Sequence, residues 1–187
     1  MTDDSSPNGD IRMMQVTHDH LLGEVVKITQ PADGYRVGSD TVLLAASVAT
    51  ANGRLLDLGA GVGGVTLCLA HRFPELQVTA VEKHGDLAAM AAENAAVNGV
   101  ANRVRVLTTD ILQMPPVLAG SFDHVVSNPP YHNSHGNTER RKQMESRLSG
   151  LQDCGKPRLR RVGGFARPDG IACLTFSTPV EARKVND

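Results

Sequence analysis

The chain has 187 residues, of which 41% are hydrophobic and 21% are charged, and its formal net charge is -1 at pH 7. This length suggests one domain, and the composition excludes a wholly disordered or fibrous protein. The chain has no apolar run long enough for a membrane span, and its acidic N-terminus does not resemble a signal peptide. Its three cysteines are scattered and include no CxxC pair. We therefore expect a cytoplasmic protein without a disulfide framework.

The first part of the chain is predicted to form a tail, a hairpin and a helix. Residues 1–15 are expected to be a disordered tail, and residues 16–53 to hold the hairpin and the helix. The β-branched content of Leu21–Gln30 predicts a strand, and Pro31–Gly34 is a turn signal before a returning strand at residues 35–37. Ser39 or Asp40 is then expected to cap a helix that ends before Asn52.

From residue 54 the pattern changes to strands that alternate with helices, and residues 54–187 are expected to form one domain with the preceding hairpin and helix. Such alternation indicates βαβ units and a parallel sheet, hence an α/β fold. The predicted elements in order are strand 54–58, helix 65–73, strand 76–82, helix 87–98, strand 104–109, strand 122–127, helix 138–153 and strand 171–176.

A glycine-rich loop at residues 59–64, in the run LLDLGAGVGG (55–64), lies between a predicted strand and a predicted helix. Gly59, Gly61 and Gly64 satisfy GxGxxG, in which glycines permit a sharp turn and a close approach to a ligand. The N-terminus of the following helix offers N–H groups to an anion. By itself the pattern also fits a tight turn that binds nothing.

Three carboxylates sharpen this interpretation. Asp57 precedes the loop, where it would meet a ligand ammonium; Glu82 ends the second strand, where it would accept from ribose hydroxyls; and Asp110 follows the third, where it would accept from an adenine amino group. This set fits an adenosine that carries an amino acid, S-adenosylmethionine, better than a pyrophosphate. The predicted cofactor-binding residues are Asp57, Gly59, Ala60, Gly61, Gly63, Glu82, Lys83 and Asp110.

The segment Asn128-Pro129-Pro130-Tyr131 follows the fourth predicted strand. The two prolines fix φ and remove two backbone donors, so the segment is stiff and its carbonyls can accept. The Asn128 side-chain oxygen and the Pro129 carbonyl would accept the two hydrogens of a planar amino group and orient the nitrogen lone pair towards a methyl donor. Tyr131 would stack on a planar substrate. All four residues are therefore predicted to form the catalytic site.

Together, DLGAGVG (57–63), Glu82, Asp110 and NPPY resemble a class I S-adenosylmethionine-dependent methyltransferase that modifies a planar amino nitrogen. ENAAVNG (93–99) resembles the segment that these enzymes carry after the second strand. The run QPADGYRVGSDTVLLAA (30–46) is similar to the valine-tRNA adenine-N6 methyltransferase group. The resemblance covers about residues 20–137 and implies methyl transfer to adenine N6 in tRNA.

The resemblance also implies a Rossmann-like sheet with helices on both faces. Its strands would run in the order third, second, first, fourth and fifth, followed by two further strands. Only residues 177–187 follow the fifth predicted strand. We therefore expect that the last two strands are lacking, which would leave the fifth as an exposed edge.

Positive charge is concentrated in residues 139–167, which hold nine arginines and lysines against three acids. Such a window attracts a polyanion, and tRNA is the expected partner, although a solvated face is the simpler alternative. The basic residues are Arg140, Arg141, Lys142, Arg147, Lys156, Arg158, Arg160, Arg161 and Arg167.

Three alternative functions remain open from the sequence. NPPY also occurs in enzymes that methylate a protein glutamine at N5, but these carry a longer helical N-terminal region. An NAD-dependent oxidoreductase would use GxGxxG but would leave NPPY unexplained. A truncated, inactive domain would bind cofactor or RNA without turnover. His132 and His135 have metal-ligand spacing but no third ligand in the motif, so we expect them to line the substrate entrance without a metal.

Overall fold

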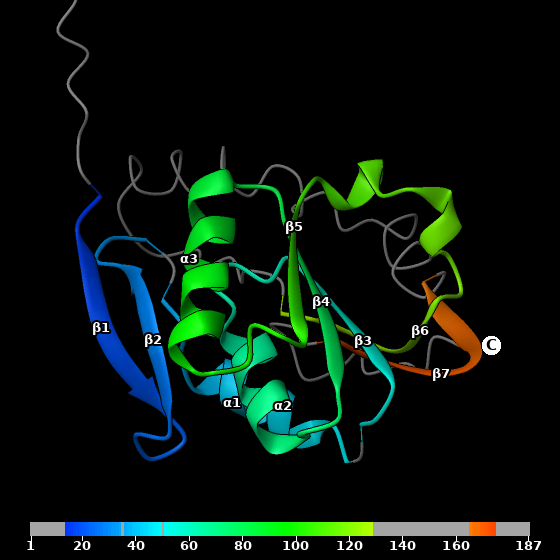
Figure 1. Ribbon diagram of the computed structural model, residues 1–187, viewed down its shortest axis with the longest axis horizontal. Coiled ribbons are helices and arrows are strands. Elements are labelled where there is room, and N and C mark those ends of the chain that lie inside the picture. Colours follow the sequence, from blue (N-terminus) through cyan, green and yellow to red (C-terminus); the bar gives the residue numbers. More distant parts are fainter. Residues whose placement is uncertain (1–13, 35, 50, 129–164, 175–187) are drawn as a thin grey trace, which may run out of the picture.

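The computed structural model describes residues 14–34, 36–49, 51–128 and 165–174 (Figure 1). Most of the expected tail, the predicted helix 138–153 and the end of the predicted strand 171–176 lie outside these ranges. The helices and strands are β1 (Val16–Leu21), β2 (Val26–Pro31), α1 (Ser39–Ser47), β3 (Arg54–Leu58), α2 (Gly64–Arg72), β4 (Gln77–Glu82), α3 (Gly85–Val97), β5 (Val104–Thr108), the 3-10 turns η1 (Ile111–Gln113) and η2 (Pro116–Leu118), β6 (Phe122–Ser127) and β7 (Ala166–Leu174).

The N-terminal hairpin lies earlier than the sequence predicts. β1 and β2 pair antiparallel, from Val16 opposite Pro31 to Leu21 opposite Val26. The turn therefore falls inside the run that was predicted as one strand. Residues 36 and 37 form no strand, so the prediction of a return there is wrong, and residue 35 lies outside the described residues. The turn was hard to recognise because Leu22 and Glu24, at φ 52° and 74°, adopt the left-handed conformation that favours glycine.

The described residues between β2 and α1 form no strand. The backbone N–H of Val37 donates to the side-chain oxygen of Gln30 at 2.8 Å, which replaces the backbone pairing of a returning strand. Gly38 is the N-cap of α1, and Ser39 and Asp40 lie inside the first turn of the helix. The prediction that Ser39 or Asp40 caps this helix is therefore wrong.

Five parallel strands form the large sheet within the described residues, in the order β5-β4-β3-β6-β7. This is the predicted Rossmann-like α/β order, with the third strand at one edge and the first in the centre. β3 and β6 match their predicted bounds to the residue. The remaining predicted strands of the sheet are shifted at one or both ends, most of all β7.

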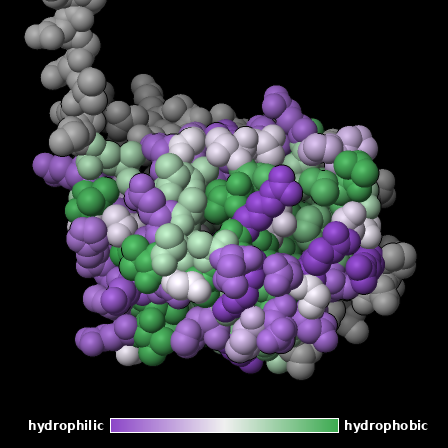
Figure 2. Space-filling view, viewed as in Figure 1, coloured by the Kyte–Doolittle hydropathy of each residue, from purple (hydrophilic) through white to green (hydrophobic). Residues whose placement is uncertain are grey.

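The two faces of the sheet carry separate hydrophobic clusters. Helices α1, α2 and α3 lie together on one face, as Figure 1 shows, and Leu55 of β3 packs with them in one cluster. Leu56 and Leu58, which alternate with Leu55, point to the opposite face and pack with Met114 and Phe165. On the outside, hydrophilic residues are interspersed with hydrophobic ones on the face seen in Figure 2.

Two asparagines of the ENAAVNG segment attach the hairpin to α3. Asn98 accepts from the Lys27 N–H at 2.9 Å and donates to the Lys27 carbonyl at 2.6 Å. Asn94 accepts from the Thr29 N–H at 2.8 Å and donates to the Thr29 carbonyl at 2.9 Å. A side-chain amide has the donor and acceptor of a peptide group, so these residues pair with β2 as a neighbouring strand would.

β7 begins before the predicted strand 171–176 and pairs in parallel with β6. Ala166 lies opposite Phe122 and Ile171 lies opposite His124, so the strand is irregular between these two pairs. Pro168 and Gly170 fall in this stretch, and both residue types argue against a regular strand, which is why the sequence predicted a later start.

Candidate functional site

The glycine loop follows β3 and crosses to the end of β4. Gly59, Gly61 and Gly63 have φ of 73°, 58° and 90°, a conformation that L side chains rarely adopt. The N–H groups of Gly59 and Ala60 both donate to the Val81 carbonyl, at 2.8 and 3.0 Å. A Cβ on Gly61 would meet no atom within 4 Å. The loop is thus tied to the sheet on one side and open on the other.

Glu82 holds the open part of this loop in place. Its side chain is almost buried, and one carboxylate oxygen accepts from the Gly61 N–H at 3.0 Å. The other accepts from the His84 N–H at 2.9 Å. A carboxylate has about four acceptor positions, so both oxygens keep capacity for ligand hydroxyls. Lys83, the neighbouring predicted residue, is half-buried.

Asp57 lies beneath the loop, with only 1% of its surface exposed. Its carboxylate accepts from the Thr66 hydroxyl of α2 at 2.6 Å. Burial raises the pKa of Asp57 to about 6; the nearby charge of Glu82 also raises it, and the hydrogen bonds from Thr66 oppose both effects. Sequence reasoning missed Thr66, because no motif marks it. Contact of Asp57 with a ligand ammonium stays a prediction.

Asp110 lies beyond the end of β5, where its carboxylate accepts from the Leu112 N–H at 2.8 Å and caps η1. Asp57, Glu82 and Asp110 therefore follow one another along the carboxyl ends of β3, β4 and β5. In open parallel sheets this edge is where ligands bind. The structure thus brings the predicted cofactor-binding residues to one edge of the sheet.

Asn128 reaches the same edge from the other side of β3. The Ser127 hydroxyl donates to the Leu58 carbonyl at 2.8 Å, which joins the ends of β6 and β3. The Asn128 amide donates to the Asp40 carboxylate at 2.7 Å and to the Thr41 hydroxyl at 3.3 Å. The other predicted catalytic residues, Pro129, Pro130 and Tyr131, lie outside the described residues, as do His132 and His135.

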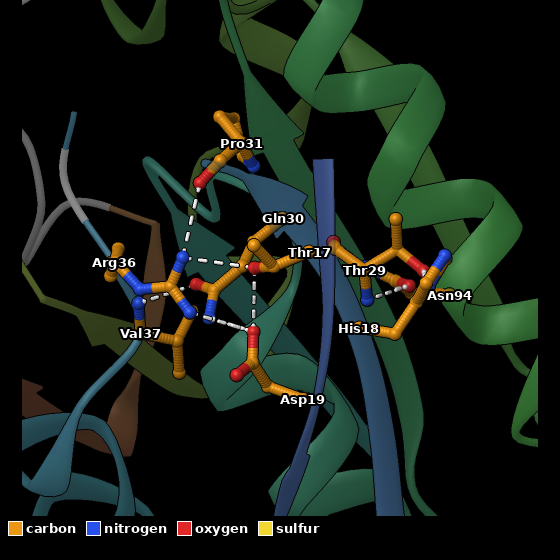
Figure 3. A network of polar contacts seen from close by, with 9 residues as sticks. All are labelled: Thr17, His18, Asp19, Thr29, Gln30, Pro31, Arg36, Val37 and Asn94. Carbon is orange, nitrogen blue, oxygen red and sulfur yellow. Dashed lines mark hydrogen bonds and ion pairs between the residues drawn. The ribbon is translucent and has the colours of Figure 1, made fainter. Parts of the chain in front are cut away.

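A polar network fixes the segment that leads into α1, the helix that carries Asp40 and Thr41 (Figure 3). Asp19 of β1 accepts from the side chains of Thr17, Gln30 and Arg36 at 2.7, 3.0 and 2.7 Å. Hydrogen bonds from Gln30 and Thr17, with the charge of Arg36, lower the pKa of Asp19. Gln30 is buried and also accepts from the Val37 N–H. Sequence reasoning missed this network, because its members lie on separate elements.

The same segment rests on the end of the glycine loop. A Cβ on Gly64 would lie 2.7 Å from one Val37 methyl carbon and 3.1 Å from the Thr41 methyl carbon. Only glycine fits there without a shift of its neighbours. The residues before and inside α1 therefore pack between the glycine loop and Asn128.

Only one member of the basic window is described. Arg167 forms an ion pair with Asp123 at 2.6 Å, so its charge is partly satisfied within the fold. The other eight basic residues lie outside the described ranges. Among the described residues, no group of three or more His, Cys, Asp or Glu side chains could hold a metal ion, and no helix is long and apolar enough to cross a membrane.

Comparison with known families accounts for this arrangement. A model of the methyltransferase small domain matches residues 34–148. The chain belongs to the methyltransferase small domain family. The match begins before α1 and includes the glycine loop, the three carboxylates and Asn128. The family prediction is therefore confirmed.

Curated relatives are similar over part of their length. The chain is 36% identical over 144 residues to tRNA1(Val) (adenine(37)-N6)-methyltransferase of Enterobacter sp. (strain 638), covering 75% of this chain and 58% of the relative. It is 41% identical over 98 residues to the protein of that name from Erwinia tasmaniensis, covering 51% and 40%. The chain thus spans roughly two fifths to three fifths of these relatives.

Solved structures confirm the fold. Pyrococcus horikoshii TYW2 in complex with MeSAdo superposes with a TM-score of 0.57 at 18% identity, over 81% of this chain and 48% of that one. A putative S-adenosyl-L-methionine-dependent methyltransferase from Methanococcus maripaludis gives 0.54 at 14% identity, over 72% and 53%. At such identities the likeness shows a shared methyltransferase fold.

Proposed function

We propose that this domain transfers a methyl group from S-adenosylmethionine to a planar amino nitrogen, with adenine N6 in tRNA as the acceptor. The observation that carries the proposal is that one edge of the sheet brings the glycine loop and Glu82 together with Asn128. Family membership supports the chemistry. The names of the Enterobacter and Erwinia relatives support adenine in tRNA as the acceptor.

The charge and the hydrogen-bond acceptors on the cofactor side of this edge support S-adenosylmethionine as the ligand. The loop is open at Gly61, beside the acceptor oxygens of Glu82. Gly59, Ala60, Gly61, Glu82 and Asp110 would hold the molecule, and a row of carboxylates suits an ammonium and ribose hydroxyls better than an anionic pyrophosphate. When bound, S-adenosylmethionine supplies an electrophilic methyl group on a sulfonium.

The acceptor side requires groups that accept hydrogen bonds. The Asn128 side-chain oxygen, with the Pro129 carbonyl, would accept from the two hydrogens of the amino group and direct its lone pair. The protein then contributes orientation and exclusion of water and no nucleophile of its own. An adenine inside a folded RNA must be unstacked or flipped to reach such a site.

Methylation of a protein glutamine is the second candidate, because an amide NH2 presents the same two donors. A domain that binds cofactor or RNA without turnover is the third. The names of the relatives favour tRNA over both. Each candidate predicts a different fate for a labelled methyl group.

Methyl transfer from labelled S-adenosylmethionine separates these candidates. The chain is incubated with total tRNA or with total protein, followed by nucleoside and amino-acid analysis. We expect label in N6-methyladenosine from tRNA and none in the N128A variant, with S-adenosylhomocysteine affinity nearly unchanged. Label in N5-methylglutamine would support the second candidate. Binding of S-adenosylhomocysteine without any transfer would support the third.

A further inference from the structure

The contact between Asn128 and α1 joins two parts of the chain that are far apart in sequence. The Asn128 Nδ2 atom lies 2.7 Å from a carboxylate oxygen of Asp40 and 3.3 Å from the Thr41 hydroxyl. Asp40 and Thr41 are in the first turn of α1, and 88 positions separate Asp40 from Asn128. The acceptor residue of the proposed site is therefore held by a helix that precedes the whole large sheet.

The chemistry of this contact determines which way the carboxamide points. An ionised carboxylate only accepts hydrogen bonds, whereas an amide has a donor end and an acceptor end. Rotating the Asn128 amide by half a turn would place its oxygen 2.7 Å from the Asp40 oxygen with no hydrogen between them. Asp40 therefore selects the orientation in which the NH2 group faces α1 and the amide oxygen lies on its other side.

The structure around Asp40 keeps its carboxylate in place. Thr41 is buried, with 2% of its surface exposed. A Cβ on Gly38 would lie 3.1 Å from an Asp40 carboxylate oxygen, so glycine leaves room there. The preceding residue, Val37, is tied to the hairpin through Gln30. The backbone on both sides of Asp40 is thus held by the fold, which favours a preorganised site.

We propose that Asp40 is a positioning residue that orients the Asn128 carboxamide with its oxygen turned away from α1, the side from which the acceptor amino group would donate, with Thr41 as a second, weaker anchor. This inference rests on the proposed function. The inference adds to that function a role for a residue that lies outside the glycine loop and NPPY. Asp40 acts through Asn128 and touches neither the cofactor nor the acceptor.

Exchange of the two side chains tests the proposal. N128D alone would place two carboxylates in contact, and we expect it to lose most of its turnover. In the D40N/N128D double variant, the new carboxamide at position 40 donates to the new carboxylate at position 128, which keeps an oxygen for the acceptor. The double variant should exceed N128D in kcat by about tenfold, because a charge-assisted hydrogen bond replaces a repulsion.

Single variants separate positioning from folding. D40A should lower kcat by about tenfold or more, as expected for a lost hydrogen bond to a charged group, while S-adenosylhomocysteine affinity and the melting temperature stay near the wild-type values. S39A, a change at the exposed neighbouring residue of the same helix turn, is the matched control and should leave kcat unchanged. Unchanged kcat in D40A, or a double variant no better than N128D, overturns the proposal.

A measurement without turnover keeps this test distinct from that of the proposed function. The side-chain NH2 signals of Asn128 are assigned in a 15N spectrum by comparison with N128A. They should shift in D40A and stay in place in S39A. Signals that do not respond to D40A overturn the contact itself. A wild-type chain that gives the expected shift but transfers no methyl group contradicts the proposed function instead.

Discussion

Asp57 is a described residue whose pKa is clearly raised by the fold. Its pKa rises from 3.8 to about 6 in the folded chain, mainly through burial. The folded state therefore keeps this proton at pH values where the unfolded state has released it. The proton's contribution to the free energy of unfolding is fully present below the unfolded pKa and is lost as pH rises through the folded pKa. A rise in the pKa from 3.8 to about 6 corresponds to about 3 kcal/mol at most.

D57N isolates this contribution, because its carboxamide does not titrate and still offers an oxygen to Thr66. The free energy of unfolding of D57N minus that of the wild type should increase between about pH 4 and pH 6 and level off above. Denaturant titrations at several pH values measure it. Asp19 and Asp123, whose pKa values are lowered, titrate in both proteins and cancel in the difference. A difference that is constant with pH would contradict the shift.

Gly64 shows why a glycine is needed at a position whose φ is ordinary. A Cβ there would lie 2.7 and 3.0 Å from the two Val37 methyl carbons. G64A should therefore lower the free energy of unfolding by about 1–3 kcal/mol through overpacking. The G64A/V37A double variant should recover part of the lost free energy of unfolding, because V37A removes the methyl groups that the new Cβ would meet. Strictly additive effects in denaturant titrations would show that the two residues do not collide.

Among the elements, α3 connects the hairpin to the glycine loop. Asn94 and Asn98 both pair with β2, but Asn94 is buried and its amide also donates to the Val62 carbonyl in the loop, at 3.0 Å. This explains in physical terms why the ENAAVNG segment carries asparagines four residues apart. On a helix such residues share a face, and they match alternate residues of a strand.

The two asparagines form a matched pair for testing this connection. N94A and N98A should each lower the free energy of unfolding by about 1–3 kcal/mol, because backbone groups of β2 lose their partners. Only N94A should also weaken S-adenosylhomocysteine binding, since only Asn94 reaches the loop. Calorimetric titration measures that affinity. Equal losses of affinity in both variants would mean that the hairpin as a whole, and not the Val62 contact, supports the loop.

Elements with strong local signals were predictable from the sequence. β3 and β6 are largely buried strands bounded by glycine or by Asn-Pro, so their ends were predicted correctly. The hairpin turn failed because two of its residues are non-glycine residues in a glycine conformation. The positions of the glycine loop, Glu82 and Asp110 at strand ends agree with their spacing in the sequence, and their contact with a cofactor stays a prediction. The Asp40–Asn128 contact was not, because no local pattern connects residues 88 positions apart.

The charge of the whole molecule is unevenly distributed. Residues 139–167 carry an excess of six positive charges by sequence, while the complete chain has a net charge of -1. Within this window, Arg167 is paired with Asp123, whose pKa is lowered by the Arg54 N–H and by the charge of Arg167. Arg167 therefore forms an ion pair within the fold, so we do not count it among the residues of the window that would bind tRNA.

If the remaining basic residues bind tRNA, affinity should fall steeply with salt. Each contacted phosphate contributes about -0.7 to the slope of log affinity against log salt for single strands and about -0.9 for duplexes. Replacing Arg140, Arg141 and Lys142 with alanine should reduce the steepness of this slope. R167A is the control and should leave the slope unchanged, because that guanidinium is engaged by Asp123. Filter-binding titrations at several salt concentrations measure the slope for each variant and for the wild type. A slope near zero in the wild type would mean that the basic window is a solvated face.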